Sequence, residues 1–132
     1  MSMLEQRGAV TIVAVAGTLI MCLFSLAAAD LGAMLHARAR AQAAADAAAL
    51  AAAVAQAPIL GRGDDPEAAA REVAEANGVT LLSCACTTGG SVATVEVQTA
   101  ARPILIAAWS SRRIRARASA EVDPDVFSYR DG

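Results

Sequence analysis

The chain has 132 residues, a formal net charge of −2 and a hydrophobic fraction of 56%. Aromatic residues make up only 3%, so side chains large enough to fill a core are scarce. The slightly acidic balance argues against a nucleic-acid-binding protein, since such proteins carry an excess of basic residues on one face.

The first element along the chain is an uncharged, mostly apolar run from Gly8 to Ala29. As a helix, its about 22 residues extend ~33 Å, enough to cross a hydrocarbon core of ~30 Å. Its polar side chains are Thr11, Thr18 and Ser25, whose hydroxyls can bond to carbonyls of the same helix. We expect a single membrane span, with the short N-terminal head in the cytoplasm and the C-terminal part outside.

A cleavable secretory signal is the alternative to a retained span. Ala27, Ala28 and Ala29 precede Asp30, which fits the small-x-small preference of signal peptidases. Cleavage near Ala29 would release the remainder as a secreted, effector-like protein. A retained anchor is favoured, because the run is longer than the usual ~7–15 apolar residues of a signal and its helical pattern continues beyond Ala29.

Nothing interrupts a helix from Val10 to Ala57, and Pro58 ends it. Its length predicts a rod of roughly 70 Å, half of it in lipid. Small residues recur at helical spacing in the membrane half, at Thr11, Ala14, Thr18, Ser25, Ala28 and Gly32, and in the projecting half, at Ala37, Ala41, Ala44, Ala48, Ala51 and Ala55. Two interpretations stay open: an alanine-rich composition alone, or a helix that packs closely against other helices of an assembly. The candidate packing positions are Thr11, Thr18, Ser25 and Gly32.

Beyond a linker at residues 58–64, a short helix is expected from Asp65 to Ala76. Asp64 is its expected N-cap, Glu67 completes a variant of the capping box, and Asn77-Gly78 is a typical C-terminal stop. Such a helix is most simply a lid on a small sheet.

Strands follow at Val79–Ala85, Ser91–Thr99 and Arg113–Val122. Apolar and polar residues alternate in the second, and they alternate strictly in the third. The segment from Ile104 to Trp109 has no clear pattern. These elements predict an α+β fold in which a long N-terminal helix precedes a short helix and a small antiparallel three-stranded sheet. The expected units are residues 1–57, the linker, a head at residues 65–124 and a tail at residues 125–132.

No catalytic constellation is present in the sequence. The single histidine, His36, has no nucleophile near it at helical spacing, and the turn at residues 87–90 lacks the lysine of a phosphate-binding loop. We therefore expect neither an enzyme nor a cofactor. Arg113, Arg115 and Arg117 have two interpretations: a charged edge strand that discourages aggregation, or a site for lipid head groups or an acidic partner.

Three cysteines are present. Cys22 lies in the apolar run and behaves as a small hydrophobe. Cys84 and Cys86 point to the same face of a strand, although a disulfide between them would be strained. They are two semi-buried thiols, or they form a bridge in an oxidising compartment. A metal site is disfavoured, because His36 is far away in the sequence.

The start at Arg7-Gly8-Ala9 and the run from Gln42 through Asp46 to Ala53 resemble the TadE/TadG-like proteins of Flp (tight adherence) type IV pilus systems. The resemblance implies a pilin-like, membrane-anchored minor subunit or accessory protein of a pilus or secretion apparatus, with other membrane subunits as partners and no nucleic acid. It also implies trimming by a prepilin peptidase, for which Gly8 is the candidate residue. Val13 departs from the pilin pattern, which has a glutamate five residues after that glycine.

Overall fold

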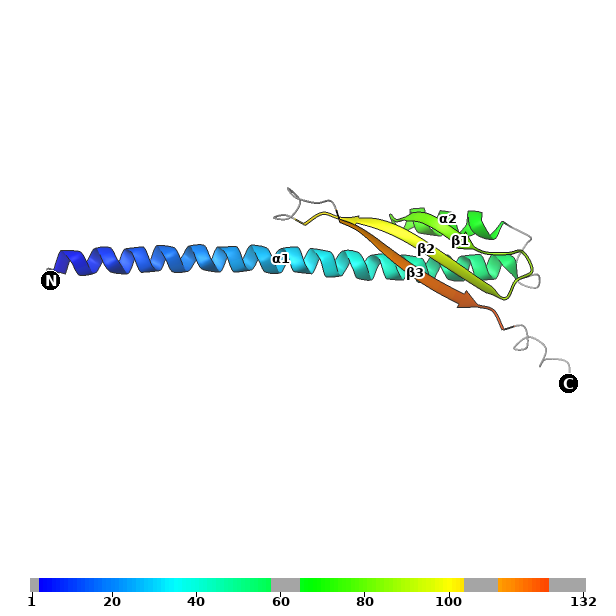
Figure 1. Ribbon diagram of the computed structural model, residues 1–132, viewed down its shortest axis with the longest axis horizontal. Coiled ribbons are helices and arrows are strands. Elements are labelled where there is room, and N and C mark those ends of the chain that lie inside the picture. Colours follow the sequence, from blue (N-terminus) through cyan, green and yellow to red (C-terminus); the bar gives the residue numbers. More distant parts are fainter. Residues whose placement is uncertain (1–2, 58–64, 104–111, 124–132) are drawn as a thin grey trace.

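The computed structural model describes residues 3–57, 65–103 and 112–123, and the expected segment from Ile104 to Trp109 lies outside this part. Its elements are α1 (Met3–Gln56), α2 (Pro66–Ala76), β1 (Thr80–Ala85), β2 (Val92–Ala101) and β3 (Arg112–Glu121). Figure 1 shows α1 as a long rod, with α2 and the sheet packed along its C-terminal half. This confirms the expected α+β arrangement of one long helix, one short helix and a three-stranded sheet.

Helix α1 is unbroken over 54 residues and begins seven positions earlier than expected, at Met3 rather than Val10. The reason is that Leu4, Glu5, Gln6 and Arg7 are all good helix formers, so no residue there stops the helix. At the other end it closes at Gln56, one residue before the expected Ala57.

Helix α2 has a different N-cap from the one expected. Asp65, not Asp64, is the cap: its carboxylate accepts a hydrogen bond from the backbone N–H of Glu67 at 3.1 Å, and Pro66 opens the helix. Because Asp65 is the cap, Glu67 lies two positions after it rather than the three of a capping box, and its side chain pairs with Arg71 at 2.6 Å.

The C-terminal stop of α2 is as expected. The N–H of Val79 donates to the Ala74 carbonyl and that of Gly78 to Glu75, which is the Schellman arrangement. It requires a positive φ, and Gly78 has φ +70°. This turn is hydrogen-bonded to α1, because Arg40 donates two hydrogen bonds to the carbonyl of Asn77, at 3.1 and 3.2 Å.

The sheet is antiparallel with the order β1-β2-β3. Strand β2 lies in the middle, and its Val95 pairs with Cys84 of β1 and with Ala118 of β3. A bulge interrupts the first pairing between Leu81 and Ser83. Val95 and Val97 are fully buried, so one face of β2 forms the centre of the core.

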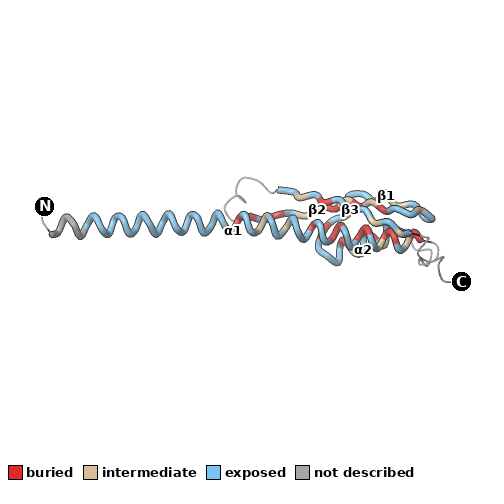
Figure 2. The backbone as a smooth tube through the Cα atoms, turned by 90° about the horizontal axis from the view of Figure 1, so that it is seen from below, coloured by how far each residue is buried: buried red, intermediate tan, exposed pale blue. Residues whose placement is uncertain are grey.

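One side of the C-terminal half of α1 covers the inner face of the sheet at β2 and β3. Helix α2 lies beside α1 and also contacts β1, so α1 rather than α2 covers most of the sheet. Figure 2 shows buried residues only in this half of the rod. The buried residues of α1 that join the core are all alanine: Ala41, Ala44, Ala45, Ala48, Ala49, Ala52 and Ala53.

These contacts bear on the two interpretations that the sequence left open for the alanines of the projecting half, an alanine-rich composition alone or packing against other helices of an assembly. Ala41, Ala44 and Ala48 pack within the chain, in the core formed with α2 and the sheet. Any surface for partner helices on the projecting half must therefore lie on the other side of α1.

Candidate membrane and assembly surface

The apolar run stands free of the rest of the molecule. Every residue from Gly8 to Ala29 is exposed, and α1 is long and apolar enough to cross a membrane. The hydroxyls of Thr18 and Ser25 donate to the carbonyls of Ala14 and Met21, each at 2.9 Å, as the sequence predicted. Their polar groups are thus satisfied inside the helix, which suits a hydrocarbon environment.

The two halves of α1 can be aligned by helical phase, because eighteen residues complete about five turns and return to the same side. Thr18 aligns in this way with His36 and Val54, and Gly32 aligns with Leu50. All five are exposed. These positions define one side of α1 that the head does not cover, called here the uncovered side. It extends from the apolar run to the end of the helix beside the head.

The head lies on the opposite side of α1. Asp30 aligns with Ala48, eighteen residues later, and both are buried, Asp30 with only 3% of its surface exposed. Gly32 and Asp30 are two positions apart, which places them roughly 200° apart around the helix. Asp30, the first residue after the apolar run, therefore lies on the side of α1 that the head covers.

The four candidate packing residues, Thr11, Thr18, Ser25 and Gly32, all lie on the uncovered side and are all exposed. A Cβ added at Gly32 would meet nothing within 4 Å, so the space beside this residue is open. Cys22 is a free, exposed cysteine on the same side, one turn after Thr18. The structure brings these residues onto one face, and their packing against a partner stays a prediction.

The candidate processing positions, Gly8 and Ala29, are exposed and lie within the continuous helix α1. His36 is exposed as well. Among the residues that the structure describes, no group of three or more His, Cys, Asp or Glu side chains is placed to hold a metal ion.

The arginine row of β3 lies on the outer face of the sheet. Arg117 pairs with Glu96 of the central strand at 3.1 Å, and Arg115 approaches the other carboxylate oxygen of Glu96 at 3.8 Å. Both guanidinium groups are about 70% exposed, so these pairs contribute little stability. Cross-strand pairing of this kind is typical of a solvated sheet face.

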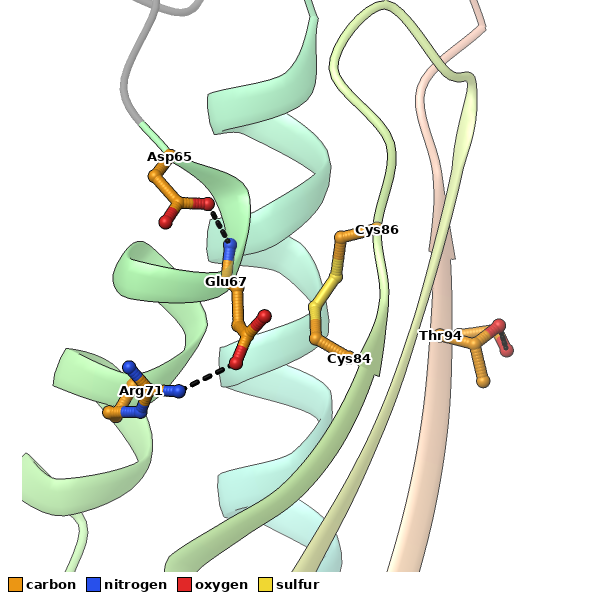
Figure 3. The surroundings of a disulfide bond; sticks show 7 residues. Asp65, Glu67, Arg71, Cys84, Cys86 and Thr94 are labelled. Carbon is orange, nitrogen blue, oxygen red and sulfur yellow. Dashed lines mark hydrogen bonds and ion pairs between the residues drawn. A yellow bond between two sulfur atoms is a disulfide. The ribbon is translucent and has the colours of Figure 1, made fainter.

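Cys84 and Cys86 form a disulfide, with their Cα atoms 5.3 Å apart. Figure 3 shows it on the side of β1 that faces the helices, whereas Thr94 points away on the other face. Both cysteines are partly buried and pack against the core, close to the N-terminal turn of α2 where Asp65, Glu67 and Arg71 interact.

The sequence did not indicate a cavity of about 370 Å³ at the end of the head nearest the apolar run. It is lined by Met34, Leu35 and Arg38 of α1 and by Arg112 and Ile114 of β3, together with two further residues. These positions are more than seventy residues apart, and no local pattern links them. Only the pairing of β2 with β3 and their packing on α1 brings them together.

Comparisons with curated proteins and with solved structures found no match. A comparison with protein families found a match that covers most of α1. The resemblance noted in the sequence is thus confirmed: residues 8–56 match the family described as putative Flp pilus-assembly TadE/G-like.

Proposed function

We propose that this protein is a single-pass, pilin-like minor subunit or accessory protein of a Flp/Tad-type pilus or secretion apparatus. It acts without catalysis, by packing the uncovered side of α1 against helices of other membrane subunits. The observation behind this proposal is that one side of α1 stays exposed from Thr11 in the apolar run to Val54 beside the head.

Two properties suit this side to helix packing. Within the bilayer its small residues, such as Thr18 and Gly32, let two backbones approach closely, which is a main source of helix association in lipid. Beside the head it presents apolar side chains to solvent, with Leu50 58% and Val54 40% exposed. A partner helix lying along the rod would cover both.

We place the N-terminus in the cytoplasm and the head outside the membrane. Trimming at Gly8 would leave the apolar run intact as an anchor. The residue five positions later is Val13, which has no charge to neutralise the N-terminal amine of a neighbouring subunit. This supports an accessory or capping role over that of a major pilin.

Substitution of two of the four small residues tests the packing surface. We expect Thr18→Leu combined with Gly32→Leu to reduce photo-cross-linking of the chain to neighbouring subunits at least several-fold, because leucine holds the helices apart. The native thiol Cys22 lies on the same side and can carry a benzophenone maleimide as the cross-linking probe.

The matched control is Ala16→Leu, which makes a similar enlargement on the head side of the apolar run, in line with Met34 eighteen residues later. It should leave cross-linking unchanged, and all variants should resist extraction from membranes with alkaline carbonate. Equal cross-linking in the double variant and the wild type would contradict the proposed surface.

Release of a secreted fragment remains the alternative, and the mature N-terminus separates the two. Sequencing of the protein from membranes should find a start at Met1 or Ala9, which keeps the span. A start at Asp30 would remove the span and favour the secreted form.

A further inference from the structure

The cavity at the end of the head nearest the apolar run has the composition of a lipid-binding site. Its lining combines Arg38 and Arg112 with the apolar side chains of Met34, Leu35 and Ile114. Arg115 also borders the cavity, although its guanidinium group pairs with Glu96 on the outer face of the sheet. We propose that this cavity binds the headgroup of an anionic phospholipid from the leaflet on the head side of the membrane. The inference rests on the membrane insertion of α1 that the proposed function assumes.

The height of the cavity above the bilayer supports this occupant. Met34 lies five residues after Ala29, or about 7.5 Å along the helix, within the polar headgroup layer that flanks the hydrocarbon core. Arg38 lies one turn higher, but side chains on a helix lean toward its N-terminus, here toward the membrane. Both therefore reach the level at which lipid phosphates lie.

The charge of the cavity is positive and largely uncompensated. In the described part of the chain, neither Arg38 nor Arg112 has an ion-pair partner, whereas Arg115 shares Glu96 with Arg117. The nearest carboxylate on the head side of α1, Asp30, is 3% exposed and makes its own polar contact. A phosphodiester would supply the missing negative charge, and guanidinium groups bind such anions well.

An apolar path leads from the cavity into the bilayer. Leu31 and Leu35 are each 60% exposed on α1 just below and beside it. Further down, a shallow groove of about 300 Å³ is lined by Ile20, Leu23, Phe24 and Ala27. Ile20 precedes Arg38 by eighteen residues, so the groove lies directly beneath the arginine on the same side. With its headgroup at the arginines, a phospholipid could therefore lay its acyl chains in this groove along the helix. A soluble anion has no acyl chains and would leave the groove empty.

The test is the lipid selectivity of the full-length chain in nanodiscs that contain phosphatidylglycerol and phosphatidylcholine, read by native mass spectrometry of the lipids that stay bound. We expect the wild type to retain phosphatidylglycerol preferentially. Arg38→Gln and Arg112→Gln should each weaken this preference about five-fold, the equivalent of ~1 kcal/mol for a basic residue at a membrane surface. The double variant should retain the two lipids in proportion to their abundance.

The matched control is Arg113→Gln, next to Arg112 in β3 but outside the cavity lining. It loses the same charge and should keep the wild-type preference. A preference for phosphatidylglycerol in the double variant equal to that of the wild type would overturn the inference. So would a loss of this preference in Arg113→Gln equal to the loss in Arg112→Gln. Displacement of phosphatidylglycerol by excess inorganic phosphate would also overturn it, because the cavity would then recognise a free anion. Carbonate extraction of the same variants reports membrane insertion separately, so failure of the proposed function would be distinguishable.

Discussion

Alanine forms most of the helical side of the core. Seven alanines of α1 and two of α2 (Ala70 and Ala74) are buried, and they meet Val95 and Val97 of the central strand. Such small side chains contribute little apolar area each, but they let the helix and sheet backbones come close together. Close-packed interiors tolerate added volume poorly. The stability of the head therefore depends on the smallness of these residues.

Enlargement of one buried alanine should test this dependence at the scale of a residue. We expect Ala45→Leu, at a fully buried position, to lower the free energy of unfolding by about 1–3 kcal/mol or to displace the sheet. Ala47→Leu makes the same change at an exposed position of the same helix and should be nearly neutral. Thermal unfolding in detergent measures both variants, and equal destabilisation by the two substitutions would contradict the burial of Ala45 in the core.

The elements could largely be predicted from the sequence, because their signals are local. The apolar run, the alternation in β2 and β3 and the Asn77-Gly78 stop each depend on neighbouring residues. The side of α1 that the head covers could not be predicted. Ala44 is buried and Ala43 is exposed, and two identical side chains give no difference in polarity from which to tell them apart.

The candidate site divides in the same way. The four small residues of the membrane half share one face because of their spacing, which the sequence displays. The cavity formed by Arg38 and Arg112 depends on the tertiary packing of β3 against α1, and no spacing reveals it. The disulfide between Cys84 and Cys86 was one of several interpretations that the sequence left open.

The junction between α1 and the β1–β2 hairpin allows a prediction at the scale of elements. Gln56 accepts a hydrogen bond from the N–H of Gly89 through its backbone carbonyl, at 3.0 Å. Its side-chain amide is buried, and within the described residues neither its oxygen nor its nitrogen has a hydrogen-bond partner. We expect Gln56→Leu to raise the free energy of unfolding by about 1–2 kcal/mol, because it removes a desolvated polar group.

Gln42→Leu is the matched comparison on the same helix. Its amide donates to Asp46 at 3.1 Å and to the carbonyl of Arg117 at 3.3 Å, so the same substitution removes two bonds. It should lower the free energy of unfolding by about 1 kcal/mol. Denaturant unfolding of the two variants should give opposite signs, and destabilisation of both would show that the Gln56 amide is satisfied.

At the scale of the whole molecule, the unbroken helix fixes the direction in which the head faces relative to the small residues in the membrane. Insertion of alanines after Ala28 changes this relation in a controlled way. Two residues rotate the head by about 200° and raise it ~3 Å, whereas four rotate it by only about 40° and raise it ~6 Å. We expect the two-residue insertion to abolish cross-linking to partner subunits and the four-residue insertion to keep most of it. A loss of cross-linking that grows with the number of inserted residues would contradict the requirement that the head and the small residues keep their relative orientation.

The continuity of α1 also determines how the molecule bears mechanical load. Tension between the membrane and the far tip of the rod passes through one ladder of backbone hydrogen bonds, from Met3 to Gln56. The sheet is fastened to the flank of this rod and lies outside the path of the force. A pull on the anchored protein would therefore stretch the helix before it peels β3 from β2.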